Sequence, residues 1–409
     1  MPSGHSVPVF EDVGGGVTAP TGFSASGVHC GLKPEGRLDL ALVDAGDRVP
    51  AAAVFTINRV AAAPVVVSRR HIADGHARAV VINAGNANAC TGEPGESAAI
   101  ATARALASTL ACDPGDVIVC STGVIGVPLP VDLIVAAVPS AARAATRSGA
   151  GDAAAAIMTT DTFAKQAAVA FTYDGARYTV AGMAKGSGMI RPDMATMLGV
   201  LTTDAPLTSS ACDAALRAAT TTTFNRVTVD GDTSTNDTVV LLANGAAGGE
   251  PIGPDAPAFA HVAEALRIVS ERLARMLARD GEGATKLVTV TVTGASTEAD
   301  AELAAFAIAD SPLVKTALFG GDANWGRVAM AAGKSGAAFD QSALAIRFAG
   351  IEVCSKGTAV PFDEEEAAAA LAADEVSIAV DLGAGSAAVT VLTCDLSYDY
   401  VRINGDYRS

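Results

Sequence analysis

The sequence predicts an α+β protein in which helices and sheets form separate layers. Strand-like apolar runs alternate with alanine-rich helical runs along the chain, which indicates a mixed class. Several hairpin signals favour this class over a doubly wound parallel sheet. Half of the 409 residues are hydrophobic but only 4% are aromatic. We therefore expect two or three domains, or two large halves, whose cores are built by close approach of small side chains.

The first elements follow from local patterns. A buried strand that ends in a polar loop is predicted over ARAVVINAG (77–85), and a helix with small residues on its buried face over GESAAIATARALASTLACD (95–113). A strand followed by a glycine loop is predicted over DVIVCSTGVIG (116–126). The next helix, over 131–149, is expected to break at Pro139, which has no backbone N–H.

A hairpin is predicted over 166–186, because two β-rich runs flank Asp174-Gly175, a pair that suits the twist of a hairpin turn. The remaining elements come from periodicity and capping signals. They are a strand over 197–204, helices over 209–224 and 257–281 with Gly281 as the stop of the second, a strand over 286–294, a helix over 361–374 with acids in its first turn, and a hairpin over 375–395.

Charge and hydropathy limit the partners of the chain. The formal net charge is -16, from 28 basic and 44 acidic residues, which argues against a nucleic acid or an anionic membrane as partner. No apolar run is long enough to suggest a spanning helix. The N-terminus lacks the basic start and apolar core of a signal peptide, so we expect a soluble cytoplasmic protein.

The cysteines and histidines give no sign of a metal centre. Seven cysteines are scattered without any CxxC pair, which speaks against a disulfide framework and against a zinc site. The loop NAGNANACTG (83–92) lacks the GxxxxGK[ST] and GxGxxG patterns, so it is predicted to support a site and not to bind a nucleotide.

The stretch KGSGMIRPDMATMLGVLTTDA (185–205) places one threonine between a loop rich in glycine and proline and a short apolar run. Gly186, Gly188 and Pro192 interrupt the approach, because glycine lets a backbone pass close to a site and proline fixes its entry angle. Ala195 then precedes Thr196, which begins what is predicted to be a buried strand. This arrangement suits attack of the threonine hydroxyl on the carbonyl before it.

Self-cleavage at this position would create a catalyst. The hydroxyl of Thr196 attacks the carbonyl of Ala195, an ester forms, and water cleaves it to leave a free α-amine beside the hydroxyl. An α-amine has a pKa of about 7.7–8.0, so it can act as a general base near neutral pH without a histidine. A threonine at a joint between loop and strand is more often structural. The residues alone leave both interpretations open.

Eight further segments and the stretch around Thr196 carry a resemblance to a known family. The segments are VTAPTGF (17–23), INAGNANACTG (82–92), STGVIG (121–126), MTTDT (158–162), FNRVTVDGDTSTNDT (224–238), DGEGATK (280–286), GDANWGR (321–327) and YVRINGDYRS (400–409). The chain resembles the ornithine acetyltransferase family, which includes bifunctional glutamate N-acetyltransferases of arginine biosynthesis. The resemblance covers nearly the whole chain.

The resemblance implies the architecture and the maturation of the protein. It implies a layered α/β/β/α-type sandwich with a self-cleaving N-terminal-nucleophile threonine. The precursor would be cut between Ala195 and Thr196, which gives an α chain, 1–195, and a β chain, 196–409. Both chains would contribute to one site, and two such units would pair as α2β2 or assemble further.

The resemblance also implies roles for individual residues. Thr122 and Gly123 match the oxyanion hole, through the threonine hydroxyl and the glycine N–H. Lys185 and Thr159 match substrate-binding positions, where Lys185 would pair with a carboxylate; Thr160 is adjacent to Thr159 and chemically similar.

Three more residues match substrate-contacting positions. Glu282 would relay protons to the leaving amine or bind the ornithine side-chain ammonium. Asn404 and Ser409 would contact the substrate from the C-terminus.

The predicted function is acetyl transfer from N-acetylornithine to glutamate through an acetyl-threonine intermediate. No metal, nucleotide or prosthetic group is expected, and acetyl-CoA would serve as a co-substrate in a bifunctional member. Two alternatives stay open: a self-cleaving amidohydrolase or aminopeptidase, and a non-catalytic metabolite-binding protein with an uncut chain.

Overall fold

One long strand, β3 (Leu40–Phe55), organises the first of two structural units because it belongs to two sheet layers. The computed structural model describes residues 8–191 and 197–406. The first half of β3, Leu40–Asp44, pairs with β2 (Ser24–Val28) and β4 (His76–Asn86). Its second half, Ala51–Phe55, pairs with β9 (Thr238–Ala243). The register against β4 shifts between Asp44 and Val49, so the strand passes from one layer to the other there.

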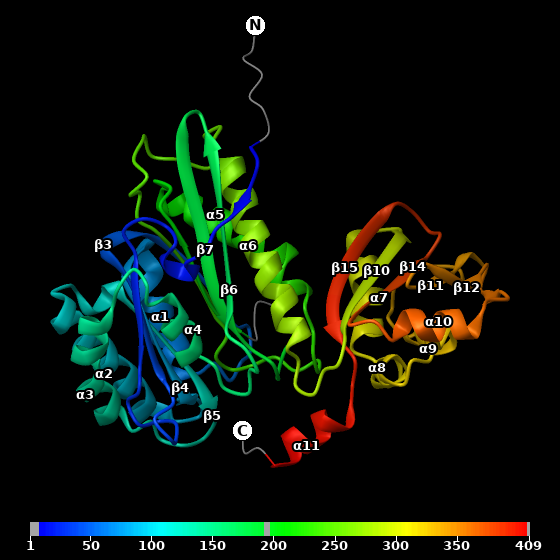
Figure 1. The fold of residues 1–409 in the computed structure, drawn as a ribbon, viewed down its shortest axis with the longest axis horizontal. Helices are drawn as coiled ribbons and strands as arrows, with labels where there is room; N and C mark the ends of the chain where they lie inside the picture. Colours follow the sequence, from blue (N-terminus) through cyan, green and yellow to red (C-terminus); the bar gives the residue numbers. More distant parts are fainter. Residues whose placement is uncertain (1–7, 192–196, 407–409) are drawn as a thin grey trace, which may run out of the picture.

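The other strands complete a continuous nine-stranded sheet that folds over at β3 (Figure 1). The first layer contains β1 (Glu11–Asp12), β6 (Lys165–Tyr173), β7 (Ala176–Lys185), β8 (Leu198–Thr203) and β9. The second layer contains β2, β4 and β5 (Val117–Val124). Pairing is mixed, because β8–β9 and β4–β5 are parallel whereas the other pairs are antiparallel.

Alternation along the strands separates three apolar cores. On β3, Leu40 and Leu42 face outward toward α2 (Gly92–Leu110) and α3 (Val131–Ala144), beside α1 (Ala63–His71). Ala41 and Val43 face inward, where they meet residues of β8 and β9 between the two layers. The outer face of the other layer packs on α5 (Ser209–Thr222) and α6 (Phe259–Arg279). The layers follow the order α/β/β/α, so the predicted sandwich is confirmed.

Small residues let these layers approach closely. Helix α4 (Ala150–Ala156) lies in the inner core, where four alanines are buried. A Cβ added to Gly27 on β2 would lie 2.0 Å from the carbonyl oxygen of Asp152, and one added to Gly149 would lie 1.8 Å from that of Ala25. No side chain fits at such distances, so glycine is required at both contacts. The expected packing of small side chains is confirmed.

The second unit is a six-stranded sheet covered by helices. Its strands are β10 (Leu287–Ala295), β11 (Ala345–Phe348), β12 (Ile351–Ser355), β13 (Thr358–Ala359), β14 (Glu375–Asp381) and β15 (Ala387–Cys394), and its helices are α7 (Glu298–Ala309), α8 (Pro312–Phe319), α9 (Trp325–Gly333) and α10 (Glu364–Leu371). Leu287 and Leu392 join the apolar core of the first unit, which links the two bodies. Helix α11 (Tyr398–Asp406) then returns beneath the first unit (Figure 1).

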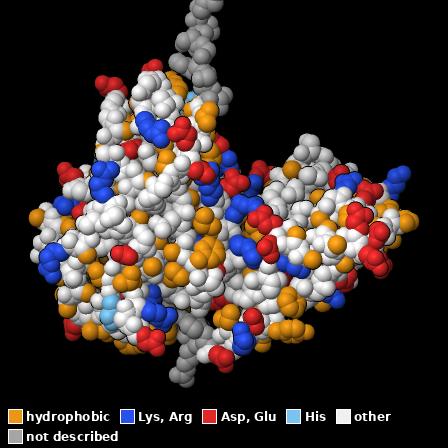
Figure 2. All heavy atoms as spheres, in the orientation of Figure 1, with side chains coloured by type: hydrophobic (Ala, Val, Ile, Leu, Met, Phe, Trp, Pro, Cys, Tyr) orange, Lys and Arg blue, Asp and Glu red, His pale blue; other side chains and the backbone are white. Residues whose placement is uncertain are grey.

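Charged side chains also join the units. Arg275 on α6 donates to Glu375 on β14 at 2.7 Å, and Arg279 lies 3.9 Å from Asp374. Figure 2 shows lysine and arginine side chains beside acidic ones where the two lobes meet. None of the described helices is long and apolar enough to cross a bilayer.

Two sequence predictions were wrong. The segment 375–395 is not a hairpin, because β10 lies between β14 and β15 and pairs with both of them. Pro139 does not break its helix: α3 continues through it. Pro139 and Val135 both lie on the exposed side of the helix, and the Val135 carbonyl has no helical partner because Pro139 lacks an N–H. Buried Ile134, Val138 and Ala141 hold the opposite face.

The predicted cut after Ala195 does not coincide with the boundary between the two units. Strands β7 and β8, which lie on either side of it in sequence, are antiparallel neighbours in one sheet. The division into α and β chains stays a prediction. If the chain is cut there, both chains contribute strands to the first unit.

Replacing Pro139 by alanine should stabilise the protein. Proline in a helix interior costs about 3 kcal/mol relative to alanine, and its stiffening of the unfolded chain returns up to about 1 kcal/mol, so Pro139→Ala should raise the free energy of unfolding by about 2–3 kcal/mol. The measurement is the midpoint of thermal unfolding. Pro312→Ala is the matched control, since Pro312 is also exposed but occupies the start of α8, where no N–H is needed. An equal rise in both variants would contradict the explanation.

Candidate active site

A cavity of about 130 Å³ lies where β4, β5 and β7 end and where β8 and β9 begin. Six of the predicted site residues line it: Thr122, Gly123, Thr159, Lys185, Glu282 and Asn404. Met197, which follows the predicted nucleophile in the chain, lines it as well. Ala195, Thr196 and Ser409 lie outside the described residues. The structure thus brings together side chains from across the sequence that had been singled out separately.

The loop with Thr122 and Gly123 is shaped by two glycines that face each other. Gly85 on β4 pairs with Gly123 on β5, and their φ angles are +118° and +132°. A Cβ on Gly123 would lie 2.3 Å from the carbonyl carbon of Gly85 and 2.5 Å from the nitrogen of Asn86. The two backbones touch here, and this contact sets the position of the Thr122-Gly123 peptide at the cavity wall.

Buried amide side chains lock the same loop. Asn236 donates to the carbonyl oxygens of Ala87 at 2.6 Å and Ser121 at 2.9 Å, which ties β9 to the ends of both parallel strands. The Ser121 hydroxyl donates to Asn83 at 2.6 Å. Asn83 in turn donates to the carbonyl of Asn86 at 2.8 Å. A satisfied buried network of this kind fixes a loop in one geometry. The predicted supporting role of residues 83–92 agrees with these contacts.

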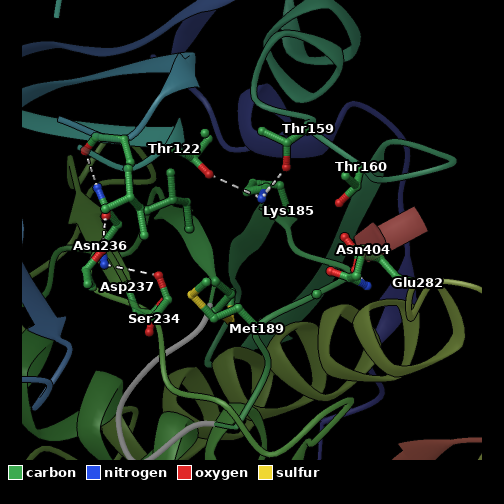
Figure 3. Close-up of a pocket in the computed structure, with 17 residues that line it drawn as sticks. Thr122, Thr159, Thr160, Lys185, Met189, Ser234, Asn236, Asp237, Glu282 and Asn404 are labelled. Atoms are coloured by element: carbon green, nitrogen blue, oxygen red, sulfur yellow. Dashed lines mark hydrogen bonds between the residues drawn. The ribbon is translucent and has the colours of Figure 1, made fainter. Parts of the chain in front are cut away.

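Lys185 is the central cation of the cavity (Figure 3). Its ammonium donates to the Thr159 hydroxyl at 2.7 Å and to the Thr122 hydroxyl at 3.3 Å. An ammonium only donates, so both hydroxyl oxygens act as acceptors and keep their own hydrogens to donate elsewhere. Thr122 therefore has a hydroxyl hydrogen to offer to a developing oxyanion. The neighbouring Thr160 bonds to Ser187 at 2.7 Å instead, so Thr159 is the threonine that contacts the lysine.

Burial lowers the pKa of Lys185, because desolvation penalises its charged form, and the carboxylate of Asp161 opposes this effect. The Asp161 Oδ2 lies 3.9 Å from the lysine nitrogen. Burial would raise the pKa of Asp161, but the adjacent ammonium groups of Lys185 and Lys165 outweigh it and hold that pKa well below its usual range.

The charged cluster extends away from the cavity. Lys165 is fully buried, lies 2.7 Å from Asp161 and contacts Asp280 as well. Asp280 also accepts from the backbone N–H of Thr162 at 3.1 Å and from its hydroxyl. Asp161, Lys165 and Asp280 were not among the predicted site residues, although MTTDT contains Asp161 and DGEGATK begins with Asp280.

Glu282 and Asn404 form the opposite side of the cavity (Figure 3). Glu282 lies in the turn after α6, where its N–H donates to the carbonyl of Ser187 at 2.8 Å. Asn404, on α11, donates to Glu282 Oε2 at 2.8 Å. A Cβ on Gly188 would lie 2.5 Å from the Glu282 carboxyl, so this glycine leaves room for the acid. The cavity thus presents a carboxylate on one side and an ammonium on the other.

The residues before the predicted cut are held firmly. Met189 has a φ of +56°, a strained conformation for a residue with a long side chain. Asp230 stabilises it by accepting from the N–H groups of Met189 at 2.6 Å and Ile190 at 2.8 Å. Burial raises the pKa of Asp230. After the predicted cut, the Met197 carbonyl accepts from the N–H of Thr238 at 3.0 Å. The chain is thus anchored before and after the predicted cleavage position.

The donor set of the cavity is suited to organic anions and ammonium groups. Within 8–191 and 197–406, no group of three or more histidine, cysteine, aspartate or glutamate side chains could hold a metal ion.

Comparison with known proteins assigns the family. The model of the ArgJ family matches residues 24–409. The chain belongs to the ArgJ family. It is 51% identical over 404 residues to the arginine biosynthesis bifunctional protein ArgJ of Symbiobacterium thermophilum, which spans 98% of this chain and 100% of that protein. The ArgJ protein of Geobacter sulfurreducens is 46% identical over 389 residues, 95% of this chain and 99% of that one. The prediction of an acyltransferase of arginine biosynthesis is confirmed by this membership.

Two solved structures are similar to parts of this ArgJ-family chain. The bifunctional argJ protein of Bacillus halodurans is 47% identical, with a TM-score of 0.49, and the match covers 50% of this chain and 97% of that one. The ornithine acetyltransferase of Mycobacterium tuberculosis, solved in complex with ornithine, is 42% identical, with a TM-score of 0.42, and the match covers 46% of this chain and 100% of that one.

Substitution of Gly123 should abolish most of the activity. Gly123→Ala would force the loop away from Gly85 and displace the predicted oxyanion donors, so we expect acetyl transfer from N-acetylornithine to glutamate to fall by about 100-fold or more. Gly126→Ala is the matched control: its φ of +80° carries similar strain, but no atom lies within 4 Å of the added Cβ. Comparable losses in the two variants would show that strain alone, and not the position of the donors, explains the effect.

Proposed function

We propose that this chain transfers an acetyl group from N-acetylornithine to glutamate through an acetyl ester on Thr196. The observation that carries the proposal is the convergence on one cavity of Met197, the Thr122-Gly123 loop, Lys185 and Glu282. Family membership supports the same reaction, because the relatives are bifunctional proteins of arginine biosynthesis.

Maturation comes first in the proposed scheme. The Thr196 hydroxyl attacks the Ala195 carbonyl, the peptide C–N bond breaks as an ester forms, and water hydrolyses the ester. The products are the chains 1–195 and 196–409, and the second begins with a free α-amine. The anchoring of Met189 and Ile190 by Asp230 supports this scheme, because it fixes the chain ahead of the reacting peptide.

Acetyl transfer then follows in two steps. The amine of Thr196 takes the hydroxyl proton, the oxygen attacks the acetyl carbonyl, and the tetrahedral intermediate places its negative charge toward Thr122 and Gly123. The C–N bond to ornithine breaks as that nitrogen receives the proton. The glutamate amine next attacks the acetyl ester, and the threonine oxygen recovers a proton as N-acetylglutamate leaves. No step requires a metal, nucleotide or prosthetic group.

The charges of the cavity match an amino-acid substrate at both ends. Lys185 would pair with the α-carboxylate, next to the Thr159 hydroxyl. Glu282, held by Asn404, would bind the side-chain ammonium of ornithine or relay a proton to its leaving nitrogen. Ser409 is assigned to the same substrate only by the resemblance. Acetyl-CoA as a second donor, and pairing of the units as α2β2, remain parts of the proposal.

Thr196→Ala is expected to yield one uncut, inactive chain, because both the attacking hydroxyl and the released amine depend on Thr196. A denaturing gel and N-terminal sequencing measure the cut, and intact mass spectrometry after incubation with N-acetylornithine measures the acetyl adduct. Thr196→Ser keeps a hydroxyl and should still be cut. A wild-type enzyme that is active but has no chain beginning Thr-Met-Leu-Gly would refute the proposal.

The rival reading, an amidohydrolase, differs in the acceptor. With N-acetylornithine and glutamate both present, we expect N-acetylglutamate to form faster than free acetate. The reason is that Lys185 can bind the carboxylate of glutamate after ornithine has left. Quantifying both products in one reaction separates the two classes. Predominant release of acetate would assign the chain to the hydrolases.

A further inference from the structure

Asp161 is a buried carboxylate that accepts hydrogen bonds from the backbone beside Lys185 and Thr159, two residues that line the cavity. Its Oδ2 accepts from the N–H of Thr159 at 2.9 Å, and its Oδ1 accepts from the N–H of Gly186 at 2.7 Å. Thr159 is the residue whose hydroxyl contacts Lys185, and Gly186 directly follows Lys185. Asp161 therefore holds the backbone on both sides of the Thr159–Lys185 hydrogen bond. Its side chain is fully buried and does not itself line the cavity.

The same carboxylate offsets the cost of burying the lysine. An ammonium inside a protein is costly unless a counter-charge lies near it. The other charged groups that act on Lys185 are Lys165, Asp237 and Glu282, and the partly buried Lys33 lies within reach as well. Among these, Asp161 gives the strongest support to the charged form.

The cluster also connects the two sides of the cavity. Lys165 lies between Asp161 and Asp280, and Asp280 is separated from Glu282 by one residue, Gly281. Asp161 and Lys165 belong to the predicted α chain, whereas Asp280 belongs to the predicted β chain. Two carboxylates and two ammonium groups, counting Lys185, balance each other in this buried set.

We propose that Asp161 is a positioning residue for substrate binding: it holds Lys185 charged and oriented toward the substrate carboxylate, and through Lys165 it couples that lysine to the Asp280–Glu282 turn. The inference rests on the proposed function, since it takes Lys185 as the carboxylate-binding group. Asp161 touches neither substrate nor reacting atoms, so its effect must appear in binding and not in the chemical step.

The test is Asp161→Asn, which keeps the size of the side chain and removes its charge. We expect the KM for N-acetylornithine to rise by about 10- to 100-fold, with kcat changed by no more than about threefold, because a charge-assisted contact to the substrate is weakened. The pH profile is the second readout. Loss of the carboxylate lowers the pKa of Lys185 further, so the rise of KM toward alkaline pH should begin at a lower pH than in the wild type.

The matched control is Asp44→Asn. Asp44 also forms a largely buried ion pair with a basic side chain, Arg78, at 3.3 Å. However, Asp44 pairs with Ala79 near the start of β4, whereas the cavity lies at the end of that strand. Its KM and pH profile should equal those of the wild type even if its thermal stability falls. A KM and a pH profile for Asp161→Asn that match this control would overturn the proposal, and so would a change confined to kcat or to stability.

Two additions keep the test decisive. If Asp161→Asn does not fold, Asp161→Glu is the alternative variant, because it retains the charge but shifts the carboxylate oxygens. A raised KM with a wild-type pH profile supports the proposal. An unchanged KM overturns it. Calorimetric binding of ornithine requires no catalysis. If the wild-type protein shows no acetyl transfer but Asp161→Asn binds ornithine more weakly than the wild type does, the proposed reaction fails while the positioning role of Asp161 is retained.

Discussion

The site depends on keeping one ammonium group charged inside the protein. Lys185 ends a central strand and is almost removed from water, and its charged form is favoured by the facing carboxylate of Asp161 and by two threonine hydroxyls that accept hydrogen bonds from it. Asp161 in turn is stabilised by Lys165, and Lys165 by Asp280. Each member of the set would be costly alone. The arrangement of the loops around the cavity follows from the need to bring these groups together in a balanced cluster.

Small residues make that arrangement geometrically feasible. The chain has few aromatic side chains to fill space between layers, and glycines and alanines let strands and helices touch through their backbones. The same property that closes the inner core at Gly27 and Gly149 brings Gly85 against Gly123 at the cavity wall. Packing and function thus draw on one feature of the composition. A bulkier core would separate the two sheet layers and with them the walls of the site.

Local patterns predicted the elements well where the decisive interactions are local. The hairpin over 166–186 was predicted from the Asp174-Gly175 pair between two β-rich runs, and in the structure both residues adopt the positive φ that its turn requires. The segment 375–395 was misread because its two strands are separated by β10, which comes some eighty residues earlier and leaves no trace in the local pattern. The positions of Thr122, Lys185 and Glu282 were named from family resemblance. Asp161, Lys165 and Asp280 were not predicted: the Lys165–Asp280 pair joins residues 115 positions apart, and the four-residue spacing of Asp161 and Lys165 does not show that their pair is buried.

Helix α11 has a practical consequence for how the protein can be handled. It leaves the second unit, crosses beneath the first, and brings Asn404 against Glu282 within a few residues of the C-terminus (Figure 1). A chain spans at most about 3.3–3.6 Å per residue, so a group attached a few residues after Asn404 starts close to the cavity. Purification tags, fluorescent reporters and immobilisation handles therefore belong at the other terminus, because β1, near the start of the described chain, lies on the side of the first unit away from α11 (Figure 1).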